Sequence, residues 1–124
     1  MKRKAPASKK KPSIPYHRKP DDMTIDQWQR ALRKQYAEMQ QFLVKNTSGN
    51  DVFSDYSVTN PGSAHTYKVA IQSKEPGWNF CSCPDFKTNL LGTCKHIEYV
   101  LLQINKQPKK RKVLNAGYQP HYTS

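Results

Sequence analysis

One stretch of sixteen residues constrains the fold more than any other. It reads CSCPDFKTNLLGTCKH, runs from Cys81 to His96, and holds every cysteine of the chain in the pattern C-x-C, ten residues, C-x-H. Three thiolates and one imidazole make a complete tetrahedral ligand set for a structural zinc ion. We therefore predict one structural Zn²⁺ bound by Cys81, Cys83, Cys94 and His96.

The ligand spacing also predicts the local structure around the ion. Residues i and i+2 of an extended strand point to the same side, so a strand can present Cys81 and Cys83 together. In a helix, residues i and i+2 diverge by about 200° around the axis. Cys94 is therefore expected at the mouth of a helix with His96 in the first turn, and a helix N-terminus favours a thiolate.

Other uses of the cysteines explain the pattern less well. An 81–83 disulfide would close a strained ring between residues too near along the chain. Buried free cysteines are common, but they do not usually gather with a histidine at ligand spacing. A redox C-x-C pair would leave Cys94 and His96 without a role.

The pattern C-x-C-x10-C-x-H, followed by an amphipathic helix, resembles the SWIM zinc finger, a ββα module whose four ligands the sequence matches one for one. The resemblance covers residues 66–106. SWIM modules occur in bacterial Swi/Snf-type helicase-like ATPases, and they are generally assigned to DNA binding or protein–protein interaction. The ending NAGYQPHYTS also resembles the segment that follows the finger in those ATPases. The resemblance thus implies an accessory or N-terminal part of a helicase-like system.

The net charge of +12 is unevenly distributed. Residues 1–20 carry eight Lys/Arg and residues 106–124 carry five, with no acid in either segment, whereas residues 21–105 carry eight Lys/Arg against nine Asp/Glu. Polycationic arms bind phosphate without reading base sequence, although basic ends can also serve solubility alone. The residues expected to contact nucleic acid are Lys2, Arg3, Lys4, Lys9, Lys10, Lys11, Lys109, Lys110, Arg111 and Lys112.

Composition and pattern divide the chain into four segments. Residues 1–20 are Lys- and Pro-rich and are predicted to be a disordered basic arm. Residues 21–65 are expected to hold a helix and a strand that precede the finger, which occupies residues 66–106. Residues 107–124 are expected to be a basic, disordered tail.

An amphipathic helix is predicted over residues 23–45. Thr24 and Gln27 form a capping box at its start, and Met23 and Trp28 form a hydrophobic staple. Apolar residues recur at spacings of three and four, which predicts a core-facing stripe made of Ile25, Trp28, Leu32, Tyr36, Met39 and Leu43. The solvated face is expected to carry Arg30, Arg33 and Lys34.

Strands are predicted over residues 52–59, 66–73 and 78–83, and the last two form a hairpin that leads into the metal site. A helix over residues 94–105 follows, with an apolar stripe of Ile97, Val100, Leu101 and Ile104. Between the second and third ligands, Phe86 and one of two leucines, Leu90 or Leu91, are expected to cover the site. Asp85 is expected to accept a hydrogen bond from within this loop. The fold class is α+β, with an N-terminal amphipathic helix, a small antiparallel sheet, a ββα zinc finger and disordered basic tails.

These features favour a binding module over an enzyme. A catalytic zinc keeps an open coordination position, and four protein ligands leave none. The sequence has no G-x-x-x-x-G-K-[ST] phosphate loop, so we expect neither ATPase activity nor a small-molecule substrate. The expected partner is nucleic acid, DNA foremost, bound largely through phosphates. The alternative is a protein–protein interaction or autoregulatory module that docks on a helicase-like ATPase.

Two further expectations concern location. No apolar stretch approaches the roughly 18–20 residues of a membrane span, so no membrane partner is expected. A zinc–thiolate cluster suits a reducing compartment, which favours a cytoplasmic protein.

Overall fold

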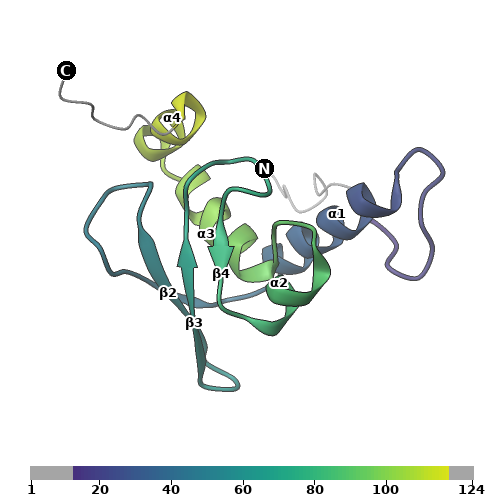
Figure 1. Ribbon diagram of the computed structural model, residues 1–124, viewed down its shortest axis with the longest axis horizontal. Coiled ribbons are helices and arrows are strands. Elements are labelled where there is room, and N and C mark those ends of the chain that lie inside the picture. Colours follow the sequence, from purple (N-terminus) through teal and green to yellow (C-terminus); the bar gives the residue numbers. More distant parts are fainter. Residues whose placement is uncertain (1–12, 118–124) are drawn as a thin grey trace, which may run out of the picture.

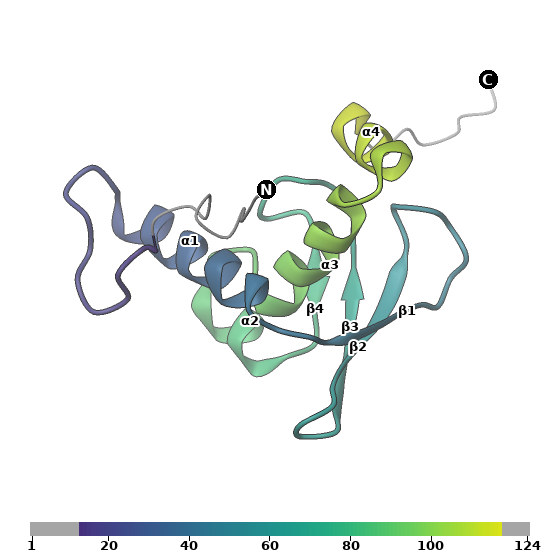
Figure 2. The same cartoon turned by 180° about the vertical axis from the view of Figure 1, so that it is seen from behind.

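A four-stranded antiparallel sheet with helix α3 against one face forms the centre of the fold, as the two opposite views in Figures 1 and 2 show. The structure is a computed structural model that describes residues 13–117. In chain order its elements are α1 (Ile25–Glu38), β1 (Leu43–Asn46), β2 (Asp55–Asn60), β3 (His65–Ala70), β4 (Phe80–Cys81), α2 (Pro84–Asn89), α3 (Lys95–Asn105) and α4 (Pro108–Ala116). The predicted α+β class is confirmed.

The strands pair in sequence order, β1-β2-β3-β4, so every neighbour is antiparallel. Alternation along β2 turns Tyr56 and Val58 toward the helices, and on β3 the register places Val69 opposite both Tyr56 and Cys81. These side chains meet the predicted apolar stripe of α3 in one core cluster. The metal ligands therefore lie within the hydrophobic core, at its β3–β4 end.

The three predicted strands exist, but their limits differ. The strand predicted over 52–59 begins only at Asp55, the one over 66–73 is His65–Ala70, and the one over 78–83 shortens to Phe80–Cys81. Val52 is buried although it precedes β2, because the loop folds back and the Tyr56 hydroxyl donates a hydrogen bond to the Val52 carbonyl at 2.7 Å. Val52 therefore extended the apolar alternation from which the strand was predicted, although it lies outside the paired residues of β2.

Helix α1 begins as predicted and ends early. The Thr24 side chain accepts from the Gln27 amide at 3.1 Å, and the Gln27 side chain accepts from the Thr24 amide at 2.9 Å, so the capping box is present. The prediction that the helix reaches residue 45 is wrong, because it stops at Glu38 and β1 occupies the end of that range. Pairing with β2 supplies backbone hydrogen bonds to β1, and it places Phe42 in the core with 6% exposure. Tertiary pairing here overrides local helical periodicity.

The predicted core stripe of α1 is also partly wrong. Ile25, Met39 and Leu43 are 65%, 68% and 62% exposed, whereas Ala37 is fully buried. α1 packs on α3 through a different side of its surface, one that includes Ala37. A helix docked on a neighbouring helix rather than on the sheet can bury small residues, and it then leaves large ones in solvent.

Two segments expected to be disordered are structured. Residues 108–116, part of the predicted tail, form α4, which begins with Pro108 in its first turn and buries Leu114 to 1% exposure in the core cluster. Residues 13–20 of the predicted arm lie against α1, where the Trp28 indole nitrogen donates to the Pro15 carbonyl at 2.7 Å. The remainder of each predicted disordered segment, residues 1–12 and 118–124, lies outside the described residues.

Over residues 13–117, none of the helices has the length and apolar character that a membrane crossing requires.

Candidate metal centre

Three consecutive elements bring the four ligands together. Cys81 ends β4, where its pairing with Val69 of β3 fixes its position in the sheet. Cys83 directly precedes α2, Cys94 directly precedes α3, and His96 is the second residue of α3. All four side chains are buried, with exposures of 0–3%. The structure therefore gathers the predicted ligand set, Cys81, Cys83, Cys94 and His96.

The predicted start of the helix that carries His96, α3, is confirmed. Cys94 is the N-cap of α3 in an extended conformation (φ −156°, ψ 175°), and its carbonyl accepts the first helical hydrogen bond, from the Glu98 amide, at 3.0 Å. Within a regular helix, the side chains of residues i and i+2 diverge by about 200° around the axis. Because only His96 lies inside α3, the side chains of Cys94 and His96 are not subject to this divergence and can point to the same ion.

Cys83 is also an N-cap, a role that was not predicted from the ligand spacing. Its sulfur accepts a hydrogen bond from the Phe86 amide at 3.4 Å, at the start of the short helix α2 in what was expected to be a loop. The helix has recognisable start signals, because Pro84 occupies its first turn and Asp85 follows. The Cys83 sulfur thus accepts from a backbone amide, and Cys94 lies at the N-terminus of α3, so both positions favour a thiolate.

The geometry of the cluster fits a tetrahedral metal site. His96 Nδ1 lies 3.7 Å from Cys81 Sγ and 3.8 Å from Cys94 Sγ, and the four donor atoms all lie within 4.8 Å of one another. Zinc bonds of about 2.3 Å to sulfur and about 2.0 Å to nitrogen imply tetrahedral S···N edges of about 3.5 Å. The observed edges are only slightly longer, and they identify Nδ1 as the coordinating nitrogen.

The chemistry of the donors points the same way. Hydrogen bonds from the thiols of Cys81 and Cys94 lower the pKa of Cys83, while donation to Cys81 and Cys83, together with burial, raises the pKa of Cys94. A buried cluster of this kind can hold one negative charge among its own thiols, but three thiolates would repel one another. A divalent cation resolves this conflict, and a soft sulfur-rich tetrahedral set suits zinc.

Two aromatic rings, neither of them anticipated, lie against the His96 imidazole. The His96 ring lies 4.8 Å from the Tyr67 ring and 5.3 Å from the Phe42 ring, measured between centroids. Phe86 and one of Leu90 and Leu91 were expected to cover the site. Phe86 is partly buried against the core and Leu91 is buried, whereas Leu90 is 93% exposed. The Tyr67 contact could have been expected from its place on the strand before the ligands, but Phe42 lies far away in sequence.

Gly92 fixes the loop that leads to Cys94. Its φ of +78° favours glycine, and a Cβ there would lie 2.5 Å from the Gly77 backbone nitrogen. The Gly77 amide also donates to the Gly92 carbonyl at 3.1 Å. This close approach joins the loop before β4 to the loop before α3, and therefore ties together the chain segments that enter the site.

Helix α1 contacts the segment between Cys83 and Cys94 through two arginines, Arg30 and Arg33, that were wrongly predicted to be solvated. The Arg33 guanidinium binds Asp85 with two hydrogen bonds, of 3.0 Å from Nε to Oδ2 and 2.9 Å from Nη2 to Oδ1. Arg30 Nε donates to the Leu91 carbonyl at 3.1 Å. The hydrogen bonds from Arg33 hold the pKa of Asp85 below its usual range. Both arginines thus bind the segment between the second and third ligands.

We expect the Arg33–Asp85 pair to contribute about 1 kcal/mol of coupling, the upper end for partly exposed pairs, because it is bidentate and its side chains are 21% and 39% exposed. A double-mutant cycle with Arg33→Gln and Asp85→Asn, read by urea denaturation of the zinc-loaded protein, measures it. The coupling should weaken as salt is raised. A coupling energy indistinguishable from zero at low salt would show that α1 is held by apolar packing alone.

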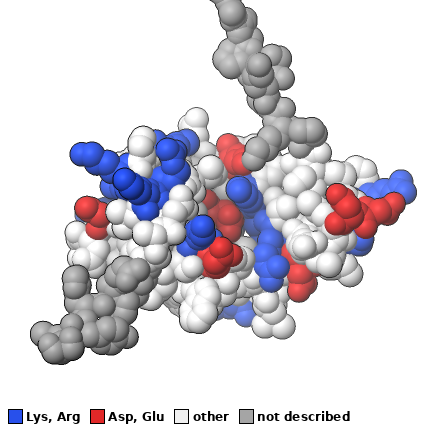
Figure 3. All heavy atoms as spheres, turned by 90° about the horizontal axis from the view of Figure 1, so that it is seen from above, with Lys and Arg blue, Asp and Glu red and all other residues white. Residues whose placement is uncertain are grey.

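The proposed nucleic-acid contacts divide into two groups. Lys109, Lys110, Arg111 and Lys112 lie together on α4, where all but the half-buried Lys110 are exposed. Figure 3 shows Lys and Arg gathered at the end of the molecule where α4 lies. The other six, Lys2, Arg3, Lys4, Lys9, Lys10 and Lys11, lie outside the described residues.

Comparisons of the chain with protein-family models, with curated proteins and with solved structures found no match. The site is a buried Cys3His cluster within metal-binding distance, a ligand set consistent with a zinc finger.

Proposed function

We propose that the chain is a SWIM-type zinc module that binds nucleic acid, DNA foremost, largely through phosphates, as an accessory part of a helicase-like system. The observation that carries this proposal is α4, which bears four consecutive basic residues and no acid. The buried Leu114 anchors α4 to the same core that holds the three cysteines. The basic run is therefore presented in a fixed position on the body rather than on a free tail.

The metal in this proposal is structural. All four donors come from the protein, all are buried, and together they complete a tetrahedral set, which leaves no position for a reacting water or substrate. The carboxylate nearest in sequence to His96 is Glu98, and it accepts a hydrogen bond from the Thr93 hydroxyl at 2.5 Å. We therefore propose that the metal centre stabilises the fold and that the basic surface binds nucleic acid.

The charge distribution supports phosphate binding. Residues 21–105 are nearly balanced, and the excess positive charge lies in residues 1–20 and 106–124. Each lysine or arginine that neutralises a phosphate releases counterions, so the logarithm of the affinity falls with the logarithm of salt by about 0.9 per contact on duplex DNA. Affinity should therefore be strongly salt-dependent and nearly independent of base sequence.

Charge-neutralising variants test the proposal without damaging the fold, because removal of the C-terminal segment would also remove the buried Leu114. One variant replaces Lys109, Arg111 and Lys112 by Gln, and a second replaces the six basic residues of 1–12. The matched control replaces three exposed lysines of the body by Gln, namely Lys45, Lys68 and Lys87. Binding to random-sequence duplex DNA is measured by fluorescence anisotropy across a salt series.

The α4 variant should lower the salt slope by up to about three, the arm variant should also lower it, and the control should leave it nearly unchanged. Zinc content and thermal unfolding should not change in any variant. An equal loss in the control would place the contact on the body instead. Failure of the unaltered chain to bind at low salt would overturn the proposal.

One observation favours the alternative, a protein-interaction module. Trp78 is 69% exposed and Leu90 is 93% exposed, and they lie on the two loops that the Gly77–Gly92 hydrogen bond joins. Exposed large apolar side chains on adjacent loops are typical of a protein-contact surface. Trp78→Ala and Leu90→Ala should leave DNA affinity unchanged if nucleic acid binds through the basic segments.

A further inference from the structure

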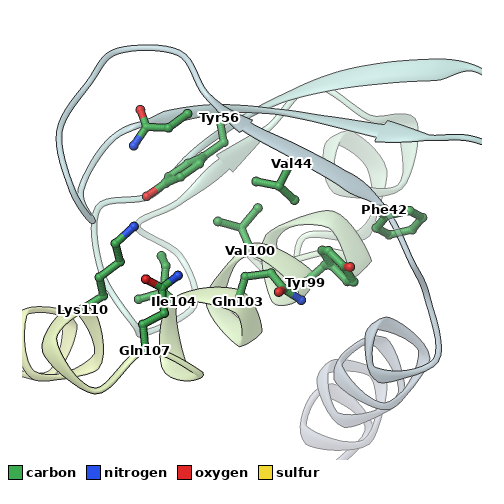
Figure 4. Close-up of a pocket in the computed structure, with 10 residues that line it drawn as sticks. Phe42, Val44, Tyr56, Tyr99, Val100, Gln103, Ile104, Gln107 and Lys110 are labelled. Atoms are coloured by element: carbon green, nitrogen blue, oxygen red, sulfur yellow. The ribbon is translucent and has the colours of Figure 1, made fainter.

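A pocket of about 330 Å³ lies between β1 and β2 on one side and α3 and α4 on the other (Figure 4). Its volume is at the lower end of the range of roughly 300–1,000 Å³ for small-ligand sites. The residues that matter for its chemistry are Phe42, Tyr56, Tyr99, Gln103, Gln107 and Lys110. The metal ligands are not among the residues that line it, so it is separate from the metal centre.

The aromatic residues of the pocket are held in place before any ligand binds. Tyr56 is 6% exposed, and its hydroxyl is bonded to the Val52 carbonyl at 2.7 Å. Phe42 is also 6% exposed, and its ring meets the Tyr99 ring at 5.0 Å with an interplanar angle of 61°. Phe42 and Tyr56 therefore form the buried base of the pocket, and the half-buried Tyr99 supplies the aromatic surface that a flat ligand can reach. Because this ring is held by Phe42, contact with it costs little conformational freedom on binding.

Several polar groups of the pocket have no hydrogen-bond partner among residues 13–117. These are the side-chain amides of Gln103 and Gln107, the Tyr99 hydroxyl and the Lys110 ammonium. Figure 4 shows Lys110 extending from α4 toward the Tyr56 hydroxyl, with Gln103 and Gln107 on the helical side. An amide offers a donor and an acceptor side by side, which is the pattern that the edge of a nucleobase also presents.

Charge selects among flat ligands. Lys110 is the one charged residue that lines the pocket, no carboxylate lines it, and Lys109, Arg111 and Lys112 flank Lys110 on α4. A ligand that combines an aromatic face, a hydrogen-bonding edge and an attached anion complements these groups. A nucleotide unit of an unpaired strand has all three features, and its base is free to leave the stack.

We propose that this pocket accepts one unpaired nucleobase of a single-stranded nucleic acid, with the adjoining phosphate on Lys110. This inference rests on the proposed function, and it adds a preference for unpaired over duplex strands. In a duplex the faces of a base are stacked and its pairing edge is occupied, so only the phosphate contacts remain. Base sequence should matter little, because every base has an aromatic face.

The test compares an oligodeoxythymidine strand of about a dozen nucleotides with an abasic strand of the same length and charge, at one salt concentration. Both strands present the same phosphates, so their affinity ratio isolates the bases. We expect the oligodeoxythymidine to bind the full, zinc-loaded chain at least about fivefold more tightly, which is the lower limit for one stacked base. A ratio of one would overturn the inference while leaving the proposed phosphate binding intact.

A pocket-filling variant locates the effect. Gln103→Trp places an indole in the half-buried lining and should reduce the ratio to about one, with the abasic strand bound as before. Gln72→Trp adds the same side chain at an exposed position outside the pocket and should preserve the ratio. Zinc content and thermal unfolding report whether each variant folds, and Gln103→Leu serves as a smaller change. An unchanged ratio in both Gln103 variants would place the bases elsewhere, and no binding of either strand would overturn the proposed function as well.

Discussion

Chelation of zinc is expected to unfold the module, not merely its metal loop. The three cysteine sulfurs belong to the same core cluster as the α3 stripe and the inner residues of β2 and β3. Binding of a structural zinc supplies about 10–16 kcal/mol in small zinc-finger peptides, which equals or exceeds the whole stability of about 5–15 kcal/mol typical of a folded domain. Loss of the metal should therefore abolish the cooperative unfolding transition.

Circular dichroism during titration with a strong chelator, under reducing conditions, measures this loss. Cys83→Ser should behave like the chelated protein, because a hydroxyl is a poor zinc ligand. Two of the four histidines offer a matched pair, since His96→Ala removes a buried ligand whereas His65→Ala changes an exposed residue at the start of β3. A folded, cooperative His96→Ala protein would show that the metal does not hold the core together.

Truncation of Leu114 should destabilise the protein by about 2–5 kcal/mol, although the residue lies in a segment whose sequence predicts a disordered tail. The side chain is 1% exposed within the core cluster, so Leu114→Ala would leave a cavity. Its neighbour Val113 is 46% exposed, and Val113→Ala should change the stability by only about 0.5 kcal/mol. The shift of the urea midpoint in the zinc-loaded protein measures both.

Equal, small effects of Leu114→Ala and Val113→Ala would mean that α4 is not packed on the body in solution. The basic residues of α4 would then act as a flexible arm, and the pocket that Lys110 helps to line would lose one of its sides. This comparison therefore bears on both proposals without any nucleic acid present.

The ligand set could be predicted because four zinc-binding side chains are gathered within sixteen residues, and the start of α3 because it depends on the short Cys94–His96 spacing. The divergence of i and i+2 positions within a helix requires Cys94 to precede the helix that carries His96, whatever the rest of the chain does. The capping box at Thr24 is equally local. Interactions decided within four residues can be recognised from sequence.

The errors concern features that distant residues decide. The apolar spacing of a helix continues to Leu43, but residues 43–46 pair with the edge of β2 and form the strand β1 instead. Arg33 looks solvated on a helical projection, yet its partner Asp85 lies 52 residues away. Residues 107–112 have the basic composition of a disordered tail, but burial of the nearby Leu114 holds α4 against the core. The start signals of α2 were local, by contrast, and could have been read.

X-ray absorption at the zinc edge of the reduced, purified protein reports ligand types and distances at the metal without reference to activity. For a closed Cys3His site we expect three sulfur neighbours at about 2.3 Å, one nitrogen at about 2.0–2.1 Å and no oxygen around each zinc. His96→Ala, if it retains metal, should lose the nitrogen and gain an oxygen from water. Fewer than three sulfur neighbours, or an oxygen neighbour in the unaltered protein, would contradict a closed site made by Cys81, Cys83, Cys94 and His96.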